Sequence, residues 1–122
     1  THDVQTRIME RFATLGLPIT AEAHFGLRDN FSFGNVPRER VERAINVVAT
    51  AEPDAIIILC TNLDGASVAA QAERRLGIPI LDSVVVSLWG ALRACGYPVT
   101  ALSDWSGALA RLPAQQTERT IR

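Results

Sequence analysis

The sequence has 122 residues, of which 48% are hydrophobic and 20% are charged, and its formal net charge is −1. This length suits one domain with its own core, and scattered charges near balance give no basic footprint for nucleic acid. All 12 cationic side chains are arginine, which excludes chemistry that needs a lysine. No apolar run is long enough to span a membrane and no signal peptide opens the chain, so we expect a cytoplasmic protein.

The first half of the chain is predicted to contain two helices and a strand. Helical spacing of apolar residues predicts a helix over residues 3–15 from Val4, Ile8, Phe12 and Leu15. Residues 17–25 are predicted to form a strand, and residues 26–35 a polar loop after it. Pro37 fits the first turn of another helix, which ends before Pro53.

Residues 54–65 are the stretch around which the rest is organised. A continuous run of β-branched and apolar residues predicts a strand buried on both faces, as in a parallel sheet. The run ends at Cys60, and small polar residues then lead into a helix predicted over residues 63–76. In open α/β sheets, ligands bind beyond the carboxyl ends of the strands.

The second half repeats the alternation of strand and helix. A short strand over residues 78–81 precedes a helix over 84–95, for which Asp82 and Ser83 supply a plain N-terminal cap. The inner stripe predicted for that helix consists of Val85, Leu88, Trp89 and Leu92, and Cys95 is expected to pack at its end. A last helix is predicted from Asp104, which would cap it, to Leu112.

The pattern of elements predicts a three-layer α/β fold, with a parallel sheet between helices on both faces. We expect one domain over residues 1–112 and a polar tail over 113–122. A helix at the very start is unusual for an α/β protein, so we expect that a first strand belongs before Thr1.

Cys60 is the main candidate for chemistry, because a thiolate is a competent nucleophile or base. The backbone amides of Thr61, Asn62 and Leu63, which lead into the next helix, would form a nest suited to a carboxylate. The alternative is a buried structural cysteine, since free cysteine is among the most buried residue types. The residues alone leave these two interpretations evenly balanced.

Asn30 is a weaker candidate. An asparagine in a loop after a strand can donate to a carboxylate, but asparagine also favours turns, and that structural interpretation is the better one by itself. Two cysteines and two histidines at scattered spacings indicate neither a disulfide framework nor a metal site.

Three segments of the chain carry a resemblance to a known family. They are IILCTNL at residues 57–63, LGIPILDS at residues 76–83 and LWGALR at residues 88–93. In this order they resemble the aspartate/glutamate racemase superfamily, in particular its maleate cis-trans isomerase and arylmalonate decarboxylase branch. The order of elements is similar from Thr1 to about Leu112.

Proteins of that family have two similar flavodoxin-like domains, each of which contributes one cysteine to a cleft that holds a small carboxylate substrate. The resemblance implies that this chain is the C-terminal domain and that Cys60 is its catalytic cysteine. It implies that Asn30, Thr61, Asn62 and Leu63 hold the substrate carboxylate.

The activity implied is a cofactor-independent isomerase or decarboxylase that acts on a small dicarboxylate, such as maleate or a substituted malonate. An N-terminal domain or a second subunit would complete the cleft, and we expect a homo-oligomer. Glutamate racemases have Cys-Thr-His where this chain has Cys-Thr-Asn at residues 60–62, which argues against amino-acid racemisation. A racemase of the aspartate, glutamate or hydantoin type and a non-catalytic module that binds an anion or a partner stay open as alternatives.

Overall fold

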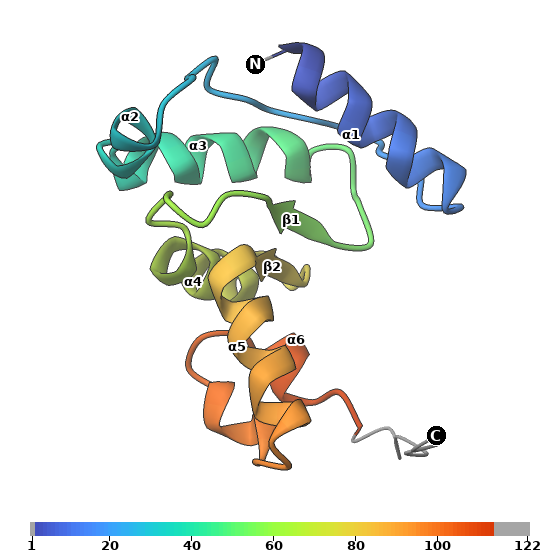
Figure 1. The fold of residues 1–122 in the computed structure, drawn as a ribbon, viewed down its shortest axis with the longest axis vertical. Helices are drawn as coiled ribbons and strands as arrows, with labels where there is room; N and C mark the ends of the chain where they lie inside the picture. The colour runs from blue at the N-terminus through green and yellow to red at the C-terminus, as the bar shows by residue number, and fades with distance from the viewer. Residues whose placement is uncertain (1, 114–122) are drawn as a thin grey trace.

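The computed structural model describes residues 2–113 and has a short parallel sheet surrounded by helices (Figure 1). Strand β1 (Ile56–Ile58) pairs with strand β2 (Ile80–Asp82), and Ile58 stands opposite Asp82 in the register. Helix α4 (Ala66–Leu76) connects the two strands, and helix α5 (Ser83–Ala94) follows β2 directly. The predicted parallel sheet with flanking helices is therefore confirmed.

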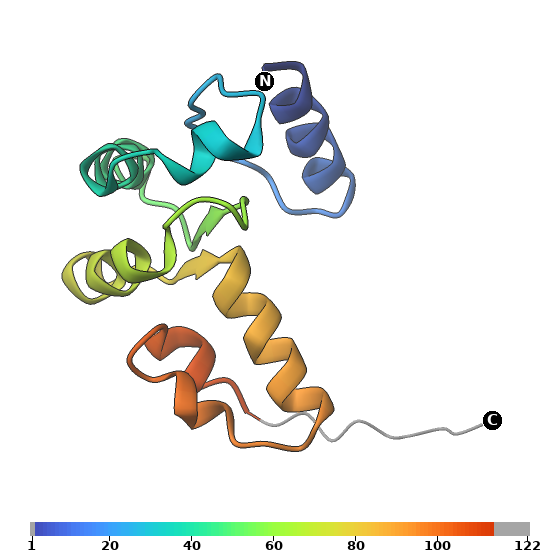
Figure 2. The same ribbon diagram turned by 60° about the vertical axis from the view of Figure 1, so that its left-hand side comes forward.

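The helices lie on both sides of the sheet. In Figure 2, α4 and α3 (Arg38–Ala49) lie on one side, and α5 and α1 (His2–Thr14) lie on the other. The short helix α2 (Asn30–Gly34) precedes α3. Beyond α5, a 3₁₀ helix η1 (Val99–Leu102) and helix α6 (Gly107–Ala110) pack at the lower end of the view in Figure 1.

The core lies between the sheet and the layer formed by α3 and α4. Side chains alternate along a strand, so Ile56 and Ile58 both point into this layer. They meet the apolar stripes of the two helices, and the buried cluster consists of Val36, Val41, Ile45, Ile56, Ile58, Leu63, Val68, Ala69, Ala72 and Ile80. Burial of each large aliphatic side chain stabilises the fold by about 1.5–3 kcal/mol.

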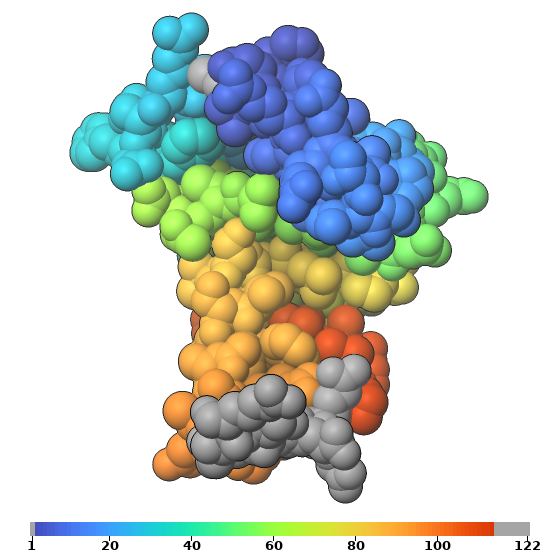
Figure 3. Space-filling model, turned by 45° about the vertical axis from the view of Figure 1, so that its right-hand side comes forward, coloured from blue at the N-terminus to red at the C-terminus, as the bar shows by residue number. Residues whose placement is uncertain are grey.

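The opposite face of β1 is open, so the prediction of a strand buried on both faces is wrong. Ile57 is 46% exposed and Leu59, just after the strand, is 58% exposed. Helix α1 contains no buried residue, so it leaves this face uncovered. Figure 3 shows another side of the molecule, with the yellow-green surface of the chain near residue 60 between α1 and α5.

The strand predicted over residues 17–25 does not form. These residues belong to no helix or strand, and the sheet of the described residues contains only β1 and β2. A strand needs a neighbouring segment to take its backbone hydrogen bonds, and no other described segment pairs with residues 17–25.

Several predicted boundaries need correction. Residues 63–65 form a turn ahead of α4 rather than its first turn, and the loop predicted over 26–35 contains α2. The last predicted helix is shorter than expected and begins later, at Gly107, because the Ser106 hydroxyl, and not Asp104, accepts the capping bond from the amide of Leu109 at 3.2 Å.

Helix α5 also differs from its prediction. Val85 is its only buried residue, Leu88 is exposed, and Cys95 is exposed instead of packed. The single domain predicted over residues 1–112 stays a prediction. Of the tail predicted over 113–122, all residues after 113 lie outside the described part of the chain. Among residues 2–113, no helix combines the length and the apolar character that crossing a membrane requires.

Candidate active site

Cys60 lies two residues beyond the end of β1, at the carboxyl edge of the sheet. Its side chain is partly buried and packs against the core cluster that contains Ile56 and Ile58. The thiol is therefore on the side of the sheet covered by α3 and α4. It is neither sealed in the core nor fully in solvent, which is the environment in which a thiol can both be held in place and reach a ligand.

The turn after Cys60 presents backbone donors to its surroundings. Thr61 and Asn62 are exposed, whereas Leu63 is buried in the core cluster and its carbonyl accepts from the amide of Gly65 at 2.8 Å. Within the described residues, the amides of Thr61, Asn62 and Leu63 donate to no other group. Three such amides next to a helix N-terminus can together accept an anionic oxygen.

Helix α2 lies beside this turn. A Cβ placed on Gly34 would be 3.8 Å from the carbonyl oxygen of Asn62. Arg38 at the start of α3 donates from Nε to Oδ2 of Asp64 at 2.7 Å, which ties a second element to the same turn. The structure thus places the end of the predicted loop, at Gly34, close to the turn that follows Cys60.

Asn30 opens α2 and is exposed. Asp29 caps the helix, since its carboxylate accepts from the amide and from the hydroxyl of Ser32 at 2.8 and 2.7 Å. The Ser32 hydroxyl, and after it the Ser32 amide, hold the pKa of the Asp29 carboxyl below its ordinary value. Asn30 makes no hydrogen bond with Cys60 or its turn in the described structure, and the close approach of α2 to the turn is at Gly34, the other end of the helix.

Asp82 is a group that the sequence interpretation assigned only to a helix cap. The cap is confirmed, because Oδ1 accepts from the amides of Val84 and Val85 at 2.9 and 3.2 Å. The second oxygen, Oδ2, is buried and has no hydrogen-bond partner among the described residues. The sequence could have indicated this second role, because Asp82 ends a predicted strand and so lies at the same sheet edge as Cys60.

No group of three or more histidine, cysteine, aspartate or glutamate side chains within residues 2–113 is arranged to hold a metal ion.

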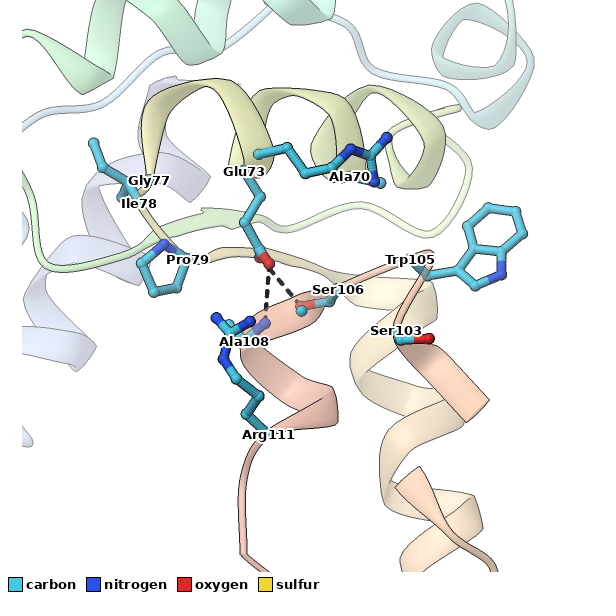
Figure 4. A pocket seen from close by; sticks show the side chains of 12 residues that line it. Ala70, Glu73, Gly77, Ile78, Pro79, Ser103, Trp105, Ser106, Ala108 and Arg111 are labelled. Carbon is cyan, nitrogen blue, oxygen red and sulfur yellow. Dashed lines mark hydrogen bonds between the residues drawn. The ribbon is translucent and has the colours of Figure 1, made fainter. Parts of the chain in front are cut away.

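A separate cavity of about 350 Å³ lies away from Cys60 (Figure 4). Glu73 stands at its centre and accepts from the amide of Ile80, the amide of Ala108 and the hydroxyl of Ser106, at 3.0, 2.9 and 3.2 Å. Because Ile80 is the first residue of β2, this cavity lies at the end of the sheet opposite to the Cys60 turn. All three donors belong to the protein itself, so Glu73 is a structural link between α4, β2 and α6.

The β-α-β core and the polar turn at its carboxyl edge define an α/β protein of the kind that binds its ligand at the ends of parallel strands. Residues 1–107 match the arylmalonate decarboxylase family, and the chain belongs to this family of enzymes. The resemblance noted from the three sequence segments is thereby confirmed.

Two relatives carry the comparison further. The chain is 32% identical over 72 residues to a maleate isomerase of Nocardia farcinica, which covers 58% of this chain and 29% of the relative. It is similar to the solved structure of Nocardia farcinica maleate cis-trans isomerase, with a TM-score of 0.74 and 25% identity, over 84% of this chain and 42% of that one. That structure is of a cysteine-to-serine mutant with a covalently bound succinylcysteine intermediate. The chain thus spans less than half the length of these relatives.

Proposed function

We propose that this chain is the cysteine-bearing C-terminal half of a cofactor-independent isomerase or decarboxylase for a small dicarboxylate, such as maleate or a substituted malonate. Cys60 serves as one of two catalytic cysteines, in the role of proton donor and acceptor. One observation carries the proposal: a partly buried thiol at a strand end stands next to three amides that have no partner within the described residues.

The binding step follows from these amides. A substrate carboxylate would lie against the backbone of Thr61, Asn62 and Leu63, with Asn30 as a further donor from α2. Donors fixed by the fold stabilise negative charge without reorganising, and this becomes most useful when charge develops on the carboxylate carbon during reaction.

The chemical step uses the Cys60 thiol. In an isomerisation, the second cysteine adds as a thiolate to the alkene carbon, and the carbanion that results takes its proton from the thiol of Cys60. Rotation about the new single bond, return of the proton and loss of the first thiolate give the other alkene isomer. In a decarboxylation, carbon dioxide leaves and Cys60 protonates the enediolate that remains.

The second cysteine would come from an N-terminal domain or from a second subunit of a homo-oligomer. Two facts support this part of the proposal: the relatives are more than twice as long as the matching region, and Cys95 lies at the end of α5 that is distant from β2. The amino-acid racemase alternative is weaker, because this chain has Asn62 at the position where glutamate racemases have a histidine.

The test is substitution of Cys60 by Ser and by Ala in the complete protein, assayed with maleate and with a substituted malonate. Loss of a proton donor of this kind is expected to reduce kcat by about 10²–10⁴-fold. Cys95→Ser is the matched control and should keep its activity. Activity of the Cys60 variants within about tenfold of the parent would exclude Cys60 from catalysis and favour the non-catalytic binding module.

A further inference from the structure

Asp82, the N-cap of helix α5, and Ser83, the first residue of that helix, contact the Cys60 segment at its two ends. The hydroxyl of Ser83 donates to the carbonyl of Ile58, two residues before Cys60, at 2.8 Å. The carboxylate of Asp82 abuts Gly65, five residues after Cys60, where a Cβ would meet Oδ2 at 2.7 Å.

The α5 cap requires only one of the two carboxylate oxygens of Asp82. Asp82 is only 1% exposed, and the α5 cap uses a single oxygen. A serine would supply that acceptor equally well, without placing a second oxygen in the interior. A buried acceptor with no partner is costly, so its presence calls for an explanation beyond the cap.

Gly65 is the residue that lies against this second oxygen. It is the N-cap residue of α4, which has no side-chain cap, and any larger residue there would collide with Asp82 Oδ2 and approach Ile58 to 3.1 Å. The close approach of Gly65 to Asp82 fixes where α4 begins. It therefore fixes the end of the turn in which Thr61 and Asn62 are exposed.

We propose that Asp82 and Ser83 are positioning residues of the Cys60 site, which hold the turn of residues 60–65 between the end of β1 and the start of α4. This inference rests on the proposed role of Cys60 and adds to it. Within the described residues, neither side chain makes a hydrogen bond with the thiol or with the amides of Thr61, Asn62 and Leu63; the two residues act through Ile58 and Gly65.

The first experiment is a double-mutant cycle between Gly65→Ala and Asp82→Ser in a Cys95→Ser background, with alkylation measured at Cys60 itself by mass spectrometry of the peptide that contains it. The methyl group of Gly65→Ala displaces α4 from the sheet and uncovers Cys60. We expect alkylation of Cys60 to be about threefold faster or more, and kcat/KM of the complete protein to fall by about tenfold. Asp82→Ser keeps the α5 cap and removes Oδ2, so the double variant should return to within about twofold of Asp82→Ser alone.

A matched pair of variants provides the second arm. Ser83→Ala removes the bond to Ile58 and should raise KM and the alkylation rate, whereas Ser87→Ala, which removes an exposed bond within α5, should change neither. Gly90→Ala is the control glycine, because a Cβ there meets nothing within 4 Å. A merely structural role would lower Tm and leave the alkylation rate of the folded protein unchanged.

Additive effects of Gly65→Ala and Asp82→Ser, or equal effects of Ser83→Ala and Ser87→Ala, would overturn the inference. If Gly65→Ala does not fold, the comparison of the two serine variants decides the question alone. The alkylation assay needs no substrate, so it separates the two proposals: an active Cys60→Ser enzyme defeats the proposed function, and unchanged alkylation defeats the positioning role.

Discussion

Glu73 on α4 accepts a hydrogen bond from the amide of Ile80, the residue with which β2 begins, at 3.0 Å. The same carboxylate accepts from Ala108 and Ser106, so one side chain joins a helix, a strand and the C-terminal helix α6. It lies at the end of the sheet away from Cys60. Stability and the proposed chemistry therefore depend on opposite ends of the same two strands.

Substitution of Glu73 by Ala should destabilise the fold by about 2–4 kcal/mol, because it leaves two amides and a hydroxyl without their acceptor in a partly buried site. Urea denaturation followed by circular dichroism measures this loss. Glu73→Gln retains one acceptor oxygen and should cost less than the alanine variant. Equal stability of the alanine variant and the parent would show that the three hydrogen bonds contribute nothing.

Neighbouring isoleucines in β1 should respond differently to truncation. Ile58→Ala removes a buried side chain from the core cluster and should cost about 2–5 kcal/mol, whereas Ile57→Ala acts on the open face and should cost less than about 1 kcal/mol. Thermal unfolding of both variants under one condition makes the comparison. A similar loss for both would mean that a surface absent from residues 2–113 covers Ile57.

Two glycines should give opposite results when replaced by Ala. Gly77 ends α4 with φ +68°, a left-handed conformation, so Gly77→Ala should destabilise by about 1–2 kcal/mol although a Cβ there meets no atom. Gly90 lies inside α5 with open space around it, so Gly90→Ala should stabilise by about 0.5–1 kcal/mol. The sign of the change in Tm for each variant is the measurement, and a stabilised Gly77→Ala would contradict the assignment.

The cap of α2 should depend on pH through Asp29. Its folded-state pKa is lowered by Ser32, so its contribution to stability is present above the unfolded value of about 3.9 and is lost as the pH falls through the lower folded value. A pH titration of the Ser32 amide by NMR should show the cap opening in that acidic window. Ser32→Ala removes the hydroxyl, which is the larger cause, and should move the Asp29 midpoint upward. No movement would assign the lowered pKa to another group.

Local patterns predicted the helices and the parallel pairing, but they could not predict which faces would be covered. Helical spacing located α1, α3, α4 and α5 to within a few residues, because periodicity is a property of each segment. Burial of Ile57 depends on what lies across from it, and none of residues 2–113 buries the apolar stripe of α1. Residues 17–25 have the composition of a strand and still need a partner strand to become one.

In the site, too, local features could be predicted from the sequence and contacts between distant segments could not. The position of Cys60 followed from the run of apolar residues that ends there, and the cap formed by Asp82 followed from its place before a helix. The contact between Asp82 and Gly65 joins residues 17 positions apart and depends on the closeness of α4 to the sheet. The number of residues between two positions does not give the distance between α4 and the sheet, so this contact could not be predicted from the sequence.

The edge of β1 that faces away from β2 has a consequence for handling the protein. The segment from Ala55 to Leu59 is five apolar residues without a charge or a proline, and within residues 2–113 only β2 pairs with it. Such an uncovered strand edge is a template on which other chains can add strands and grow into aggregates. The chain should therefore remain in solution longest when this edge is covered, and the loss of its cover should appear first as a concentration-dependent rise in light scattering.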